Sequence, residues 1–193
     1  LREAIDNIAI NTNKLSTLSK DEIINQGFKY HLKGDISNAT KFYQYFISKG
    51  FSHPVVYCNY GIILNNLGKP KEAEYFTRKA IEMDNNFAEA HSSLGIILDY
   101  IGLKEKAFDS HFKAIEIDKV TSHYQVVMAS FLDRVNAFDL DKDKLRKILN
   151  ILLESNYISH KKLYNTFFQL YNKKLTKYLD NPFLDISLLN DYR

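Results

Sequence analysis

Reactive side chains are few in this sequence, and their spacing matches no catalytic motif. Cys58 is the single cysteine, and His53 lies shortly before it. A thiolate and an imidazole can act as nucleophile and base, but this spacing belongs to no known pair, and a single small thiol on a helix is usually structural. A single cysteine also excludes a disulfide scaffold, a multi-cysteine zinc site and CxxC redox chemistry. We therefore predict a structural role for Cys58.

An alternating acidic run at Asp139, Asp141 and Asp143 is similar to the start of a calcium-binding loop. However, Lys144 and Asn150 stand where such a loop requires glycine and glutamate. The run is better interpreted as an acidic helix N-terminus, where the helix dipole stabilises carboxylates.

The remaining signatures of chemistry are absent from the sequence. It holds no glycine-rich phosphate loop, HExxH helix or GxSxG elbow. His31, His91, His111 and His160 stand singly, without a second metal ligand at helical spacing. We therefore predict that the chain is not an enzyme and holds no metal or cofactor.

The composition is that of a folded chain, because 45% of the 193 residues are hydrophobic and 25% are charged. The net charge of +3 is too small to indicate nucleic acid as a partner. No apolar run approaches the ~20 residues of a membrane helix, and no signal peptide opens the chain. We expect a soluble, cytoplasmic protein without membrane contact. Leu1 in place of an initiator methionine indicates a processed or trimmed chain.

The positive charge is concentrated in the last third of the chain. Basic and acidic residues balance through residue 121, so the excess lies beyond it. The lysines that contribute most are Lys161, Lys162, Lys173, Lys174 and Lys177. They could form a contact surface for RNA or an acidic partner, but a solvated helix face is the favoured interpretation.

Small residues recur along the chain at a step of 34 residues. The sets are Gly27, Gly61 and Gly95; Gly34, Gly68 and Gly102; and Ala39, Ala73 and Ala107, with Ala80 and Ala114 adding one further pair. Apolar residues between the glycines follow helical spacing. The second glycine of each repeat, at Gly34, Gly68 and Gly102, is suited to end a helix in the left-handed conformation. The first glycine and the alanines allow two helices to approach closely, so each repeat is predicted to be a helical hairpin.

This pattern resembles the tetratricopeptide repeat (TPR) family. The resemblance implies an all-α fold, a right-handed α-solenoid of stacked helical hairpins with additional C-terminal helices. It places repeats at 20–53, 54–87 and 88–121, after an N-terminal helix or cap at 1–19. A degenerate repeat or capping hairpin is expected at 122–155, followed by C-terminal helices and a tail at 156–193. The departures from the family pattern are Ile23 and His91 at an aromatic position, and Phe51, Asn85 and Lys119 at the closing proline.

In this family the first helix of each repeat lines a concave groove, and helical spacing then selects the exposed positions. The predicted partner-binding residues are Ile24, Asn25, Phe28, His31, Asn59, Ile62, Asn65, Asn66, Ser92, Ser93, Ile96, Asp99 and Tyr100. The alternative is that neighbouring helices cover the apolar members, Ile24, Phe28, Ile62 and Ile96.

The predicted groove contains no lysine or arginine. Chaperone-binding members of the family hold a carboxylate with a clamp of Lys, Arg and Asn, and of the corresponding residues here only Asn59 matches; the others are Ile24, Phe28, Glu89 and Ser93. The acids Asp21, Glu89 and Asp99 would repel an anion. The resemblance and these side chains therefore favour a non-catalytic protein–protein interaction scaffold that binds an extended neutral or basic peptide.

Two further hypotheses remain open. Asn25 and Asn59 occupy the position at which the TPR arm of protein O-glycosyltransferases carries peptide-holding asparagines. The chain could thus be the substrate-recruiting N-terminal arm of a larger methyl-, glycosyl- or sulfotransferase. It could also form a homo-oligomer through its C-terminal helices, where Phe167, Phe168 and Tyr171 supply apolar surface.

Overall fold

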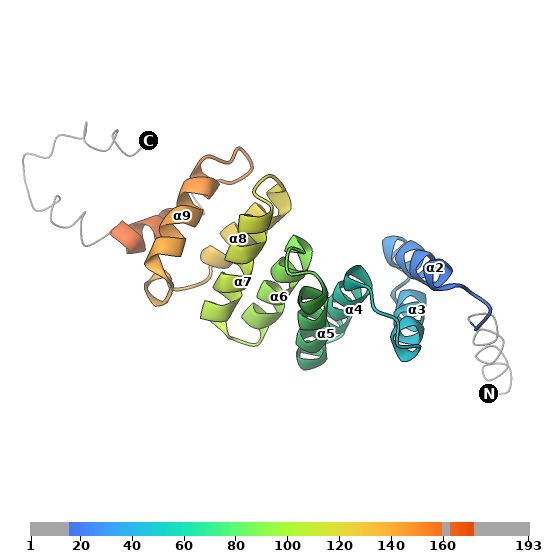
Figure 1. Cartoon of the computed structure of the whole chain (residues 1–193). Coiled ribbons are helices and arrows are strands. Elements are labelled where there is room, and N and C mark those ends of the chain that lie inside the picture. Colours follow the sequence, from blue (N-terminus) through green and yellow to red (C-terminus); the bar gives the residue numbers. More distant parts are fainter. Residues whose placement is uncertain (1–15, 160–162, 172–193) are drawn as a thin grey trace, which may run out of the picture. The chain divides into compact units, whose positions relative to one another are not determined.

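The computed structural model describes residues 16–159 and 163–171, and every regular element in that part is helical (Figure 1). The chain divides into two compact units, Leu1–Ile117 and Asp118–Arg193. Residues 1–15 of the expected N-terminal helix or cap at 1–19, the C-terminal lysines and the tail beyond residue 171 lie outside the described residues.

The first unit consists of three helical hairpins that follow one another along the chain (Figure 1). They are α2 (Lys20–Leu32) with α3 (Ile36–Ser48), α4 (Pro54–Asn66) with α5 (Pro70–Met83), and α6 (Ala88–Tyr100) with α7 (Lys104–Ile117). The first helices therefore begin at a constant step of 34 residues. Contacts also join successive hairpins, because α5 lies against α6 and α4 lies against α6. The all-α, TPR-like architecture predicted from the repeat is confirmed in this unit.

Each hairpin turns on a glycine in the left-handed backbone region. Gly34 and Gly68 have φ of 73°, and Gly102 has φ of 85°. At the second turn the Gly68 amide donates to the Asn65 carbonyl at 3.0 Å, and the Lys69 amide donates to the Leu64 carbonyl at 2.9 Å. This pair of bonds satisfies carbonyls that a helix end otherwise leaves without partners. The other two turns repeat it, which confirms the predicted role of the second glycine.

The first glycine of each repeat lies where the paired helices approach most closely. A Cβ added to Gly27 would meet the Tyr43 ring at 2.7 Å, and one added to Gly95 would meet the His111 ring at 2.5 Å. At Gly61 it would overlap the Thr77 hydroxyl. The alanines opposite are also buried, with Ala73 at 0% exposure. The repeated small residues are thus explained by helix contact.

The second unit begins with α8 (Ser122–Leu132), continues through a short 3-10 helix at Ala137–Asp139 and α9 (Lys142–Leu153), and has a further helix at 163–171. The connection from α8 to α9 is longer than the three-residue turns of the first unit and contains no glycine. Side chains of the helix at 163–171 bond backbone groups at the end of α8 and in this connection. The Thr166 hydroxyl donates to the Leu132 carbonyl at 3.2 Å, and the Gln169 amide oxygen accepts from the Ala137 amide at 2.7 Å.

Candidate functional site

The exposed side of the three first helices is the candidate site, which we call the first-helix face. Helical spacing and side-chain exposure define it as Asp21, Asn25, Phe28, His31 and Leu32 on α2, Asn59, Ile62, Asn65 and Asn66 on α4, and Glu89, Ile96, Asp99 and Tyr100 on α6. Ten of the thirteen predicted partner-binding residues belong to it.

Three predicted binding residues are buried, so the face is narrower than the sequence indicated. Ile24, Ser92 and Ser93 are 8%, 3% and 7% exposed. Ile24 and Ser92 occupy the same repeat position as Cys58, which is fully buried, and the Cys58 thiol lies 3.9 Å from the Ser93 hydroxyl. That repeat position turns inward, and Ser93, one residue further along α6, is buried as well. The prediction that these three side chains are available to a partner is corrected accordingly.

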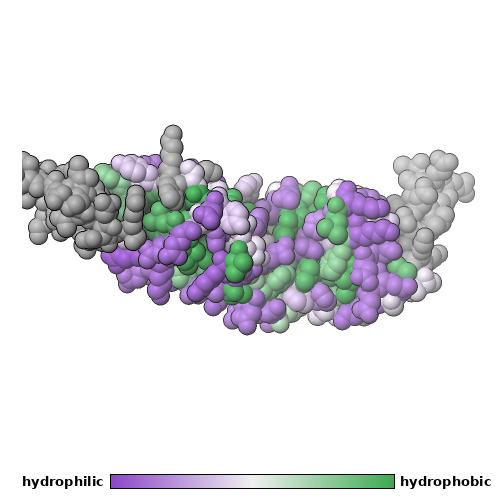
Figure 2. All heavy atoms as spheres, turned by 90° about the horizontal axis from the view of Figure 1, so that it is seen from above, coloured by the Kyte–Doolittle hydropathy of each residue, from purple (hydrophilic) through white to green (hydrophobic). Residues whose placement is uncertain are grey.

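The apolar members of the face differ in exposure. Phe28, Ile62 and Ile96 stand at equivalent positions of the three repeats; the first two are half-buried and Ile96 is 42% exposed. Leu32 and Tyr100 are 90% and 67% exposed. Of the four apolar residues predicted to line the groove, only Ile24 is therefore covered by neighbouring helices. Figure 2 shows the same mixture on the side that it displays, with apolar side chains between polar ones.

A hydrogen-bonded cluster underlies the first half of the face. The Asn59 side-chain amide donates to the Tyr43 hydroxyl at 3.4 Å, and that hydroxyl lies 3.3 Å from Nδ1 of His31. Burial raises the pKa of Tyr43 to about 12, opposed by the bond from Asn59. Asn59 thus has a structural bond that its sequence position did not reveal, whereas Asn25 and Asn66 remain exposed.

Glu89 is the acid whose charge acts on side chains of the other two first helices. Burial lowers the pKa of His31 on α2, and the Glu89 carboxylate on α6 partly opposes that shift. The same carboxylate adds to the effect of burial on Cys58 of α4, whose pKa is raised to about 12. A single carboxylate therefore acts on side chains of both preceding first helices.

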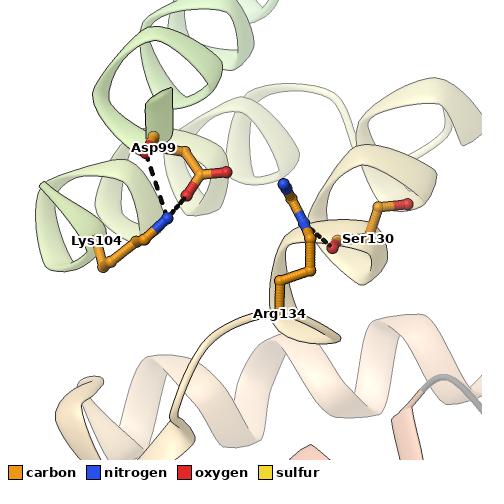
Figure 3. Close-up of polar contacts among 4 residues, drawn as sticks. All are labelled: Asp99, Lys104, Ser130 and Arg134. Carbon is orange, nitrogen blue, oxygen red and sulfur yellow. Dashed lines mark hydrogen bonds and ion pairs between the residues drawn. The ribbon is translucent and has the colours of Figure 1, made fainter. Parts of the chain in front are cut away.

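The third predicted acid is neutralised within its own hairpin. Figure 3 shows the Lys104 ammonium beside the Asp99 carboxylate, and it also donates to the Asp99 carbonyl at 3.3 Å. Asp21 and Glu89 form no ion pair among the described residues. The uncompensated charge of the face is consequently negative.

A cavity that the sequence did not reveal lies among α5, α6 and α7. Its volume is about 370 Å³, and it is lined by Arg78, Ile81, Glu82, His91, Leu94, Asp109, Ser110 and Lys113. Arg78 pairs with Glu74 at 2.9 Å, and the Ser110 hydroxyl donates to the Lys106 carbonyl at 2.9 Å. The cavity forms between consecutive hairpins, so no local sequence signal marks it.

In the second unit, Arg134 folds back so that its Nε donates to the Ser130 carbonyl at 2.9 Å (Figure 3). Tyr164 and Phe168 stack with ring centroids 6.1 Å apart on the helix at 163–171, and are 64% and 37% exposed. Phe167 and Tyr171, also named in the self-association hypothesis, are half-buried.

No group of three or more metal-ligating side chains occurs among residues 16–159 and 163–171. Over the same ranges, no helix combines the length and apolar character needed to cross a membrane.

The sequence matches no family model and no curated protein. Solved structures of TPR domains are nevertheless similar in fold. The first TPR of Spaghetti (RPAP3), bound to the HSP90 peptide SRMEEVD, matches with a TM-score of 0.53 and 17% identity over 59% of this chain and 93% of that chain. The TPR2B domain of yeast Sti1, in a pHsp70 complex, matches with a TM-score of 0.53 and 23% identity. The match covers 60% of this chain and 98% of that chain.

A third structure, MamA, covers more of the chain. It matches with a TM-score of 0.56 and 18% identity over 86% of this chain and 97% of that chain. Together with the hairpin geometry, these likenesses establish the fold of a TPR-like repeat protein, an all-α solenoid.

Proposed function

We propose that the chain is a non-catalytic protein–protein interaction module that binds an extended peptide segment on its first-helix face. The observation that carries this proposal is the combination, on one face of three stacked hairpins, of exposed apolar side chains with exposed amides. Ile96 and Tyr100 offer apolar contact area, and Asn66 offers both a donor and an acceptor to a peptide backbone.

The likeness to TPR domains solved with peptides supports this class of ligand, but the charge of the face favours a different sequence. The peptide bound to RPAP3, SRMEEVD, carries three acidic side chains. Here Asp21 and Glu89 are uncompensated, and α4 and α6 contain no lysine or arginine. Like charges across an interface disfavour binding. We therefore propose a neutral or basic segment as the ligand.

Variants of exposed residues test the proposal. Asn66→Ala combined with Ile96→Ser removes one amide and one apolar contact from the face. Tyr75→Ala is the matched control, because Tyr75 is 57% exposed on the second helix α5. Proteins captured from a lysate of expressing cells are quantified for the wild type and both variants, with thermal melts alongside.

The proposal predicts that the same partner is captured by the wild type and by Tyr75→Ala, and is lost from the double variant without a change in melting. Capture that survives the double variant but not Tyr75→Ala would place the binding surface on the second helices and refute the proposal.

A further inference from the structure

Resting on the proposed function, we propose that Glu89 seats a lysine or arginine side chain of the bound peptide and so makes the first-helix face selective for basic segments.

The position of Glu89 fits this role. It is the second residue of α6 and is exposed, and it forms no ion pair with any described residue. Contacts join α6 to the neighbouring first helix α4, and the Glu89 carboxylate also acts electrostatically on His31 of α2 and Cys58 of α4.

Lys20 and Lys104 already have other contacts within the chain. The Lys104 ammonium pairs with Asp99. Lys20, beside Asp21 at the start of α2, is turned away, with Nζ 5.9 Å from the centre of the Phe46 ring and 6.0 Å from that of Phe51. Neither ammonium is held against Glu89, so a cation from a partner meets an available carboxylate.

Half-buried apolar side chains of the same face suit the stem of the same ligand residue. Phe28 is half-buried, with its ring 6.2 Å from Tyr43 and 6.3 Å from His53, centre to centre. Ile62 stands at the equivalent position of the next repeat and is also half-buried. Lysine and arginine bury their methylene stems on such surfaces while the charged end reaches a carboxylate. A glutamate in the ligand would gain neither contact nor charge pairing.

The test uses three pools of short synthetic peptides that share uncharged flanking residues and carry lysine, glutamine or glutamate at the centre. Binding of each pool is measured to the wild type, to Glu89→Gln and to Glu105→Gln. Glu105 is the matched control because it is exposed and is the second residue of α7, so both substitutions remove the same interaction with a helix N-terminus.

The wild type is expected to bind the lysine pool about threefold more tightly than the glutamine pool, the range of a partly exposed ion pair. Glu89→Gln removes that preference and Glu105→Gln keeps it. Added salt reduces the preference in the wild type, because exposed charges are screened.

Other outcomes separate this inference from the proposed function. A lysine preference that persists in Glu89→Gln overturns the inference. The inference is also overturned if the wild type binds the lysine and glutamine pools equally. If the double variant Asn66→Ala with Ile96→Ser then loses this binding, the proposed function remains intact. Wild-type protein that binds no pool contradicts both.

Nuclear magnetic resonance of His31 gives a second measurement that needs no ligand. Because Glu89 opposes the lowering of the His31 pKa, Glu89→Gln is expected to lower that pKa further, and Glu105→Gln is expected to leave it unchanged. An unchanged His31 pKa in Glu89→Gln would show that this carboxylate does not reach across the face.

Discussion

At the scale of single residues, the contact between Gly61 and Thr77 shows most directly why the repeat retains its glycines. Alanine normally stabilises a helix interior relative to glycine by about 1 kcal/mol. Here the added Cβ would overlap the Thr77 hydroxyl and lie 3.1 Å from the Ala73 carbonyl. Gly61→Ala is therefore expected to lower the free energy of unfolding by about 1–3 kcal/mol, measured by urea denaturation.

Thr77 provides the matched background for this experiment. Its hydroxyl is buried without a hydrogen-bond partner among the described residues, so Thr77→Ala creates space without breaking such a bond. In that background Gly61→Ala should be much less costly. The same cost in both backgrounds would show that the two side chains do not collide.

We expect the stability of the first unit to depend on pH, because His91 is buried and His31 and His53 are half-buried. Burial lowers the pKa of His31, His53 and His91 below the ordinary value of 6.5. The unfolded chain therefore takes up protons at 6.5 while the folded chain does not, and the free energy of unfolding decreases as the pH falls through that value. Carboxyl groups whose pKa is lowered, such as Asp35, also reduce the free energy of unfolding on acidification. They do so only when the pH falls near or below their ordinary pKa of 3.8.

We expect a lower urea midpoint at about pH 5.5 than at about pH 7.5. His91→Gln should reduce this difference, because glutamine can still donate to the Asn85 carbonyl that His91 contacts at 3.0 Å but cannot be protonated. His123→Gln, at an exposed position, is the control and should leave the difference intact. A midpoint independent of pH would contradict the burial of these imidazoles.

At the scale of elements, the regular hairpins could be predicted and the irregular connection could not. The step of 34 residues marks both the glycine turns and the close helix contacts, because all three hairpins have the same turn and the same contact between their helices. The segment from α8 to α9 has no such repetition. Its closure depends on Thr166 and Gln169, which lie more than thirty residues along the chain from the groups that they bond.

Thr166→Val tests that closure. Leu132 is the last residue of α8, where a carbonyl has no intrahelical partner, and Thr166 is only 1% exposed. Loss of the hydroxyl should reduce the stability of the second unit by about 1–2 kcal/mol. Hydrogen exchange should show faster exchange in α8 and α9, with little change in α4 to α6.

Thr40→Val is the control substitution. The Thr40 hydroxyl also donates to a carbonyl, that of Ile36 at 2.7 Å, but this carbonyl lies inside a helix and keeps its backbone partner. Equal effects of the two substitutions would show that Thr166 does not close the end of α8.

At the scale of the whole molecule, the sequence indicated which helices form the candidate face but not which of their side chains remain accessible. Repeat position identified Ile96, Tyr100 and Asn66 correctly as exposed. It could not reveal that Ser93 is buried or that Asn59 bonds Tyr43, because both depend on side chains of neighbouring helices. The pairing of Asp99 with Lys104 was also missed, since it crosses a turn.

The central claim is that a peptide binds on the first helices and not on the second. Site-specific photo-crosslinking tests it most directly, with a photoreactive phenylalanine analogue placed at Tyr100 of α6 or at Tyr75 of α5. The Tyr100 side chain is 67% exposed on the first helix of its hairpin. The Tyr75 side chain is 57% exposed on the second helix of the preceding hairpin. With the lysine-centred pool, we expect a crosslink at position 100 and none at position 75. A crosslink at position 75 with none at position 100 would contradict it.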